Sequence, residues 1–319
     1  MSGALSPARF ANKLGGAFLL ALIGSAAVFF VMRAGQGDPA LTVLGDQATP
    51  EAIADFRRRW RLDDPLILQY LRWLGGAAIG DFGRSMTVAG GVPITGLIAS
   101  RLPNTLFIGV YAILIAVAVS LIAGTISALR HGRLIDTAAT SLAVLGISMP
   151  DFWLSYVLVY ALALGLGLFP SYGFTPPGES FVGALHSGFL PALAIAAPMA
   201  AAFTRILRTA LLETLHRDYV RVARSMGLKG AFIFVHYVLR NALIPYVTVV
   251  GLQVRYLLGG TVVVERIFGV PGIGALMVDA AFGRDYPLVQ ACALTFLLAV
   301  LLVNFVVDLI VGALNPRQA

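Results

Sequence analysis

The sequence predicts an all-α, polytopic membrane protein with six transmembrane helices. The chain of 319 residues is 58% hydrophobic and only 12% charged, and its mean hydropathy is +0.85, which lies outside the range of soluble globular domains. Uncharged stretches of about 20 residues, long enough to cross the hydrocarbon core, recur along it. The net charge of +7 comes largely from short segments between these stretches. We therefore interpret it as anchoring of cytoplasmic loops rather than as nucleic-acid binding.

The first stretch, Leu14 to Met32, follows Arg9 and Lys13. It is longer than the apolar core of a cleavable signal, and no small-residue cleavage site follows it. We expect it to remain as the first membrane helix, so that residues 1–32 form the first part of the chain. Residues 33–101 form the second part of the chain, and residues 102–319 form the third, which holds five further spans. These spans are predicted at Leu102–Leu129, Thr137–Phe169 with a kink at Pro150, Ser187–Thr204, Asn241–Val264 and Tyr286–Val307.

The distribution of basic residues predicts that both termini are cytoplasmic. Positive charges precede the first span, join the second to the third, and crowd the loop of residues 213–241 between the fourth and the fifth. The opposite side holds the Glu179 loop and the Glu265–Asp285 loop, which are poor in positive charge. The segment of residues 33–101 is longer than the loops to which this charge rule applies.

The external segment of residues 33–101 is predicted to contain helices. Thr49 can cap a helix that begins at Pro50, and Ile53, Phe56 and Trp60 then fall on one face. A second helix is expected to start at Asp64-Pro65. The arginines of this segment form a solvated or headgroup-facing surface in the simpler interpretation, and a docking surface for an external partner in the other.

Catalytic and metal-binding patterns are missing from the sequence. The two lysines, Lys13 and Lys229, are followed by leucine and glycine, so no phosphate loop is formed. The four histidines lack metal-ligand spacing, and no serine lies in a Gly-x-Ser-x-Gly elbow. The single cysteine, Cys292, can form neither an internal disulfide nor a thiolate metal cluster, and we expect it to face lipid or to pack. We therefore assign no catalytic residue and no metal ligand.

With these residues assembled, the chain resembles the membrane-spanning subunit of a bacterial ABC importer, specifically the first permease of the dipeptide and oligopeptide branch. The similarity covers nearly the whole length. It is carried by Leu62-Asp63, Pro65, Gln69-Tyr70, Trp73, Gly80-Asp81-Phe82-Gly83, Ser85, Arg101-Leu102-Pro103-Asn104-Thr105-Leu106, Arg240-Asn241-Ala242, Pro245, Val263-Val264-Glu265, Pro271-Gly272, Asp285-Tyr286-Pro287 and Gln290.

The loop of residues 213–241 is similar to the importer loop that has the pattern Glu-Ala-Ala, three residues, Gly, nine residues and Ile-x-Leu-Pro. Counting from Gly227 places Arg221, Val222 and Ala223 at the Glu-Ala-Ala positions, and Leu239 and Arg240 at Leu-Pro. Of the three Glu-Ala-Ala positions, only the last alanine is therefore retained. A salt bridge from a glutamate at position 221 is excluded.

The resemblance implies that a short cytoplasmic coupling helix, about Arg217 to Gly230, sits in a groove of a separate ATPase subunit. Small side chains at Ala223 and Gly227 would allow close approach, and Arg221 and Arg224 could reach acidic or carbonyl groups of the partner. The alternative is that these arginines contact lipid headgroups. The candidate coupling residues are Arg217, Tyr219, Arg221, Ala223, Arg224, Gly227 and Leu228.

The resemblance also implies the partners and the location. A second, non-identical permease, two ATPase subunits, an external substrate-binding protein and membrane lipid are expected, and nucleic acid is not. This chain would bind no cofactor itself, and ATP and magnesium would lie on the ATPase subunits. The location implied is the bacterial cytoplasmic (inner) membrane. Dipeptides, oligopeptides, glutathione, nickel chelates and some sugars remain open as substrates.

Two charged residues, Asp151 and Arg255, fall inside predicted spans, where ionisable groups are costly and usually face a cavity or a partner. They could line the translocation path and meet the amine and carboxylate of a peptide. The simpler interpretations are that Asp151 caps the half-helix after Pro150 and that Arg255 pairs with a neighbouring subunit. A secondary transporter or channel is the alternative function, but it would need inverted repeats or a chain of intramembrane carboxylates.

Overall fold

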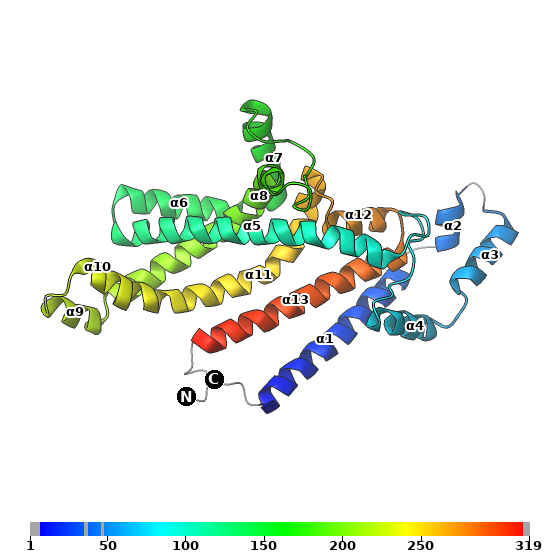
Figure 1. Ribbon diagram of the computed structural model, residues 1–319, viewed down its shortest axis with the longest axis horizontal. Coiled ribbons are helices and arrows are strands. Elements are labelled where there is room, and N and C mark those ends of the chain that lie inside the picture. The colour runs from blue at the N-terminus through cyan, green and yellow to red at the C-terminus, as the bar shows by residue number, and fades with distance from the viewer. Residues whose placement is uncertain (1–6, 35–37, 46–47, 315–319) are drawn as a thin grey trace. The chain divides into compact units, whose positions relative to one another are not determined.

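The computed structural model describes residues 7–34, 38–45 and 48–314. These residues form helices and no β-strand beyond an isolated antiparallel bridge between Arg84 and Pro93. The predicted all-α class is therefore confirmed. In chain order (Figure 1) the elements are α1 (Pro7–Ala34), α2 (Pro39–Leu44), α3 (Pro50–Trp60), α4 (Leu66–Ala78), α5 (Ile94–Leu129), α6 (Leu134–Ser148), α7 (Asp151–Leu158), the π-helix η2 (Val159–Gly165), α8 (Phe181–Leu215), α9 (Asp218–Ser225), α10 (Gly230–Ile233), the π-helix η3 (Phe234–Leu239), α11 (Arg240–Phe268), α12 (Ile273–Phe282) and α13 (Tyr286–Leu314).

Four of the described helical segments are long and apolar enough to cross a membrane, namely Ile94–Leu129, Phe181–Leu215, Gly230–Gln253 and Tyr286–Val307. The count rises to six if each of two bent helix pairs is one span, and a shorter apolar helix covers Phe18–Arg33. The predicted spans at 14–32, 102–129, 187–204, 241–264 and 286–307 each fall inside one continuous helix. The third prediction falls on one of the bent pairs, and the fifth ends within Gly259–Phe268, the first helical stretch of the other pair.

The break in the third predicted span is sharper than a proline kink. Helix α6 ends at Ser148, Met149 is extended with φ −88° and ψ 125°, and α7 begins at Asp151 after Pro150. The two helical stretches on either side of this break are bent by 110°. A residue before proline is pushed out of the α region by the proline ring, so the helix stops there instead of bending. Val159–Gly165 then continues as a π-helix.

The described residues pack as two compact units, the first comprising 106–270 and 302–314, and the second 7–105 and 271–301. The three-part division expected from the sequence, at 32 and 101, remains a prediction. Each unit has its own apolar core within the part of the chain that the structure describes.

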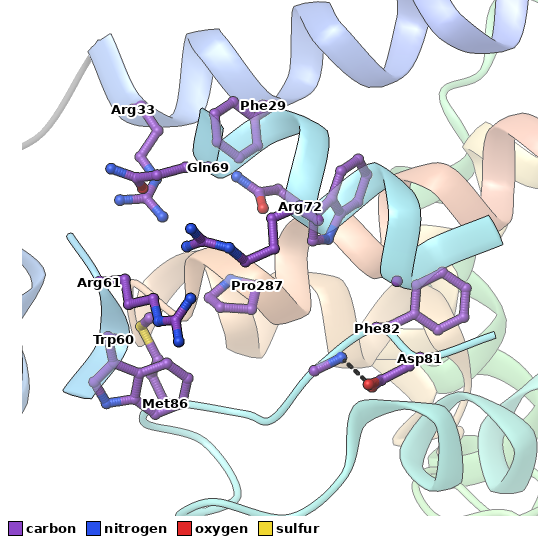
Figure 2. Close-up of a pocket in the computed structure, with 14 residues that line it drawn as sticks. Phe29, Arg33, Trp60, Arg61, Gln69, Arg72, Asp81, Phe82, Met86 and Pro287 are labelled. Carbon is purple, nitrogen blue, oxygen red and sulfur yellow. Dashed lines mark hydrogen bonds between the residues drawn. The ribbon is translucent and has the colours of Figure 1, made fainter. Parts of the chain in front are cut away.

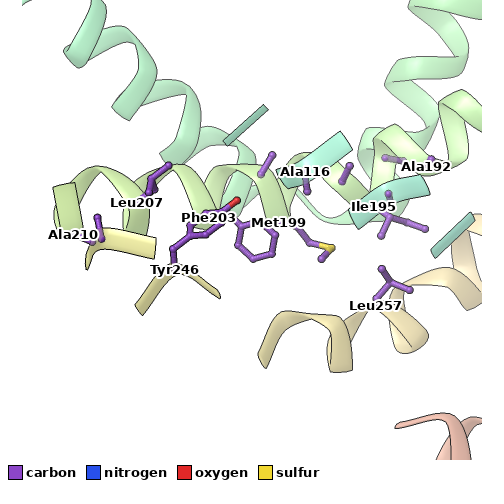
Figure 3. Close-up of a cluster of buried hydrophobic side chains, with 14 of the residues drawn as sticks. Ala116, Ala192, Ile195, Met199, Phe203, Leu207, Ala210, Tyr246 and Leu257 are labelled. Atoms are coloured by element: carbon purple, nitrogen blue, oxygen red, sulfur yellow. The ribbon is translucent and has the colours of Figure 1, made fainter. Parts of the chain in front are cut away.

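Helix α8 supplies much of the core of the first unit. Its buried residues are rich in alanine, which lets neighbouring helices approach closely. At Gly124 of α5 a β-carbon would lie 3.1 Å from the β-carbon of Leu207 and from the carbonyl oxygen of Thr204. The hydroxyls of Ser120 and Tyr246 share a buried hydrogen bond of 2.7 Å. Figure 3 shows the cluster with Ala192, Ile195, Met199, Phe203, Leu207 and Ala210 of α8 beside Ala116, Tyr246 and Leu257.

A buried ion pair joins α5, α6 and α8 at one end of this core. Nε of Arg208 donates to Oδ1 of Asp136 at 2.6 Å, and Nη2 donates to Oδ2 at 2.8 Å. The same carboxylate accepts hydrogen bonds from the hydroxyl of Ser127 and from the backbone N–H of Gly132. Nδ1 of His131 lies 3.0 Å from Oδ2. The Asp136 side chain is 5% exposed and that of Arg208 is 22% exposed, so water screens this pair little.

In the second unit, the two helices predicted for residues 33–101 are confirmed. Thr49 is the N-cap of α3, its hydroxyl accepts from the N–H of Ala52, and Pro50 is the first helical residue. Helix α4 begins directly after Pro65. Tyr70 of α4 reaches α1, where its hydroxyl hydrogen bonds to that of Ser25 at 2.9 Å. The external location of α3 and α4 stays a prediction.

The loop expected between Glu265 and Asp285 contains a helix that the sequence analysis did not predict. Helix α12 follows the break at Pro271-Gly272 and packs into the core of the second unit with Cys292, which is fully buried. Packing, and not exposure to lipid, is therefore the environment of this cysteine. Asp285, also fully buried, accepts from the hydroxyl of Ser85 and from the backbone N–H groups of residues 87, 88 and 288. It ties the loop before α5 to the start of α13.

Candidate functional site

The predicted coupling segment forms a short helix followed by a turn. Helix α9 covers Asp218–Ser225, with Arg217 at its N-cap position. Figure 1 shows α9 and α10 together where the chain passes from α8 to α11. The expected helix of Arg217 to Gly230 is thus shorter than predicted, because the turn at Gly227 ends it.

Gly227 closes α9 with a Schellman motif. Its backbone N–H bonds to the carbonyl oxygen of Arg224 at 3.0 Å, and the N–H of Leu228 bonds to the carbonyl of Ala223 at 3.3 Å. This motif needs a left-handed residue, and Gly227 has φ +77°. No atom lies within 4 Å of the position that a β-carbon would occupy. Glycine is required here by backbone conformation, and the space beside it is open.

Helix α9 presents three different faces. Val220 and Ala223, three residues apart, are buried in the core of the first unit. A second stripe, Tyr219, Val222 and Met226, is apolar and exposed, with Val222 at 56% and Met226 at 73%. The third stripe carries the exposed side chains of Arg217, Arg221 and Arg224. We call the exposed residues Arg217, Tyr219, Arg221, Val222, Arg224, Met226 and Leu228 the coupling surface.

The burial of Ala223 corrects one expectation. Ala223 is only 4% exposed, so its small side chain allows α9 to approach the rest of its own chain and not a partner. The other six predicted coupling residues are exposed. Arg221 makes one weak ion pair, 3.5 Å from Asp218, with both side chains largely in solvent, which contributes little. Val222 and Met226 were not predicted as surface residues, although their spacing from Tyr219 is helical.

The second predicted site, Asp151, lies beside a cavity of about 230 Å³ in the first unit. Pro150, not Asp151, occupies the N-cap of α7, and no side-chain hydrogen bond caps that helix. The interpretation of Asp151 as a hydrogen-bonding cap is therefore wrong. Oδ2 of Asp151 lies 2.9 Å from where a β-carbon of Gly260 would be, so glycine lets the carboxylate approach α11. The lining also includes Ile195, Met199, Gln253 and Leu257.

No hydrogen bond or ion pair within the described part of the chain involves the carboxylate of Asp151. Arg255 is carried by α11, but its side chain lies outside the described residues, so a pairing with Asp151 stays a prediction. Among the described residues, no group of three or more His, Cys, Asp or Glu could hold a metal ion.

The fold and these sites define a helical membrane component of a transport system. A family model described as "Binding-protein-dependent transport system inner membrane component" matches residues 116–319, and a model for the N-terminal part of such membrane components matches residues 9–108. The chain belongs to this family of inner-membrane permease subunits. It is a transport component of an ABC importer and not itself an enzyme.

Curated relatives cover almost the whole chain. It is 36% identical over 291 residues to "Oligopeptide transport system permease protein AppB" of Bacillus subtilis (strain 168), covering 91% of this chain and 92% of that protein. It is 37% identical over 294 residues to "Glutathione transport system permease protein GsiC" of Escherichia coli (strain K12), with coverage of 92% and 93%. The resemblance inferred from motifs is confirmed.

Solved structures support the same fold. A chain of the MetNI methionine ABC transporter in an inward-facing conformation aligns with a TM-score of 0.54 at 18% identity, covering 69% of this chain and 96% of that one. A chain from "an amino acid ABC transporter with histidines" gives a TM-score of 0.53 at 17% identity, covering 68% and 93%. At these identities the likeness concerns the fold alone.

Proposed function

We propose that this chain is one of two non-identical permease subunits of an ATP-driven importer that takes up peptides or peptide-like solutes such as glutathione. The names of the relatives AppB and GsiC support this substrate class. An external binding protein would deliver the solute, and both termini of the chain would be cytoplasmic. Two separate ATPase subunits would bind ATP and magnesium, and this chain would bind neither.

The observation that carries the proposal is the coupling surface. Exposed apolar side chains next to guanidinium groups are typical of protein interfaces, in which aromatic residues, methionine and arginine are enriched. Tyr219, Val222 and Met226 give α9 an apolar ridge that solvent alone does not favour. The buried Val220 and Ala223 fix this ridge to the body of the first unit. A movement imposed on α9 would therefore be transmitted to α8, which it directly follows.

Co-purification tests this proposal. The chain is tagged and isolated from its native cells as wild type, Arg224→Glu and Arg130→Glu. Arg130 is the matched control, because it is an exposed arginine in another predicted cytoplasmic loop. We expect Arg224→Glu to lower the yield of ATPase subunits several-fold and Arg130→Glu to leave it unchanged. Equal yields from all three proteins would contradict the assignment of the coupling surface.

A role of Asp151 in the translocation path is a second proposal, supported by the cavity beside it and by the absence of a described partner for its carboxylate. A carboxylate with this environment could meet the amino group of a passing peptide. We propose that Arg255 meets the carboxylate of the same peptide. The test measures uptake by Asp151→Asn of a peptide and of its N-acetylated form.

A further inference from the structure

The second unit contains a cavity of about 240 Å³ that the transport proposal does not use. At about 30 Å³ per water molecule, the cavity has room for roughly eight waters or for one small polar headgroup. Figure 2 shows its lining, which comes from α1, the end of α3, α4, the loop of residues 81–86 and the start of α13. The cavity is built from five separate segments of one unit.

Three donors that line this cavity are buried without a hydrogen-bond partner among the described residues. They are Nε of Arg33, Nε1 of Trp73 and Nε2 of Gln290. Gln290 is only 2% exposed, so bulk water does not replace the missing acceptor. A buried donor without an acceptor lowers the stability of the folded chain. A ligand that offers several acceptor oxygens would satisfy these groups together.

The charges around the cavity favour an anion. Arg33, Arg61 and Arg72 all line it, and in Figure 2 their side chains reach toward the same space. Arg72 is partly neutralised by Asp64 at 2.9 Å. No ion pair with a described acid holds Arg33 or Arg61.

Two further contacts define the electrostatics of the lining. Asp81 is the one acidic residue among the described lining residues, and its Oδ1 accepts the backbone N–H of Gly83. The guanidinium of Arg33 lies 5.5 Å from the ring centre of Phe29 and 6.0 Å from that of Tyr286. Arg61 ends α3 in a left-handed conformation with φ +52°, which is unfavourable for a non-glycine residue. This backbone is held strained where the side chain lines the cavity.

Helix α4 joins this polar site to an apolar surface. Its residues Gln69, Arg72 and Trp73 line the cavity, whereas Ile67 and Leu71 on another face are exposed at 67% and 56%. Phe30 and Val31 of α1 are also exposed apolar side chains next to the lining residues Phe29 and Arg33. An amphiphile could therefore place its acyl chains on these surfaces and its headgroup in the cavity.

We propose that the cavity binds the phosphate group of an anionic membrane phospholipid. Guanidinium groups match phosphate geometry with paired hydrogen bonds, and arginine with tryptophan is the usual combination at a membrane–water interface. Free phosphate shares this chemistry and lacks only the acyl chains. The site is independent of the coupling surface and of the identity of the transported solute.

Tryptophan fluorescence of the full chain tests the proposal, because Trp60 and Trp73 line the cavity. The third tryptophan, Trp153, is removed as Trp153→Phe in all proteins. The purified protein in dodecyl maltoside is titrated with phosphatidylglycerol or phosphatidylcholine that carry brominated acyl chains, which quench nearby tryptophan. We expect the anionic lipid to quench at a lower mole fraction than the zwitterionic one.

The variants are Arg61→Gln and Gln290→Leu, with Arg59→Gln as the control on an exposed position of α3. Loss of one charge-assisted hydrogen bond should raise the half-saturating mole fraction of phosphatidylglycerol about ten-fold in Arg61→Gln, and Arg59→Gln should titrate as wild type. Gln290→Leu, which removes only a neutral donor, should weaken binding less. Only variants that elute as wild type on size exclusion are compared.

Three results would overturn the lipid assignment. Equal quenching by the two lipids would mean that only acyl chains bind. Wild-type affinity in both Arg61→Gln and Gln290→Leu would show that the lipid does not bind in the cavity. Displacement of the lipid by millimolar inorganic phosphate, but not by chloride at equal ionic strength, would assign the site to free phosphate instead.

Discussion

Replacing Arg208 by methionine should lower the free energy of unfolding by about 3 kcal/mol, because it leaves a carboxylate charge without its cation. Asp136 is only 5% exposed, and its two oxygens face Nε and Nη2 of Arg208 at 2.6 and 2.8 Å. Breaking a buried pair costs about 3–5 kcal/mol. The lower end applies because the contacts of Asp136 with Ser127, Gly132 and His131 remain and Arg208 itself is 22% exposed.

The informative comparison is a double-mutant cycle with Asp136→Leu. That single change loses the ion pair and leaves the neutral donors of Ser127 and Gly132 without their acceptor, for a cost of about 3–4 kcal/mol. Independent effects would sum to about 6–7 kcal/mol, whereas a coupled pair should make the double variant only about 4 kcal/mol less stable than wild type. The difference of about 2–3 kcal/mol is the interaction that the structure predicts.

Denaturant unfolding in detergent micelles, followed by far-ultraviolet circular dichroism, measures all four free energies. The exposed Arg205 on the same helix provides the control, since Arg205→Met should change stability by less than about 0.5 kcal/mol. A double variant whose loss equals the sum of the two single losses would refute the reasoning. In that case the interaction free energy between Asp136 and Arg208 would be zero.

Three further predictions concern the loop, the second unit and the cavity. Gly227→Trp should uncouple ATP hydrolysis from uptake while the protein remains inserted, because the side chain would fill the open space beside α9; ATPase and uptake assays on the assembled complex measure this. Asp285→Ala should lower the free energy of unfolding by about 2–4 kcal/mol, since it removes the acceptor for the hydroxyl of Ser85 and for backbone N–H groups; denaturant unfolding measures it. Asp151→Asn should reduce uptake of peptides with a free amino group several-fold and spare N-acetylated ones, as measured with radiolabelled substrates.

Each of these predictions has its control. Asparagine at position 227 adopts the left-handed conformation with little strain, so Gly227→Asn should retain coupling. Normal substrate-stimulated ATPase activity and uptake in Gly227→Trp would contradict the assignment of the coupling surface. Glu179→Ala, at an exposed acid, should leave stability unchanged, and an equally small effect of Asp285→Ala would show that its hydrogen bonds contribute no net stability. Identical uptake of both substrates by wild type and Asp151→Asn would leave Asp151 without a transport role.

Local features of the structure were predictable from the sequence where a short pattern specifies them. The Thr49-Pro50 cap and the start of α4 after Pro65 each depend on a few neighbouring residues. The depth of the break at Pro150 was underestimated, because proline alone does not reveal whether a helix bends or stops. Helix α12 was missed, since a helix of ten residues between breaks is too short for a span pattern.

Long-range contacts were not predictable in the same way. Ser85 and Asp285 were both recognised as motif residues, yet nothing in the local pattern indicates that they are bonded across 200 positions. The pairing of Asp136 with Arg208 spans 72 positions and is equally hidden. For the candidate site, the role of Ala223 was not predictable from the sequence. A small residue can face either a partner protein or the chain's own core, and only the packing around α9 decides between them.

The burial of Cys292 makes the natural protein suitable for mapping its own topology. It is the only cysteine in the chain, and its thiol is enclosed in the core of the second unit, where structural thiols are inert. A cysteine introduced at an exposed position, such as Glu179→Cys or Leu228→Cys, would therefore dominate the reaction with a membrane-impermeant maleimide. Labelling of intact cells against inverted vesicles would then assign each loop to one side of the membrane without first building a cysteine-free background.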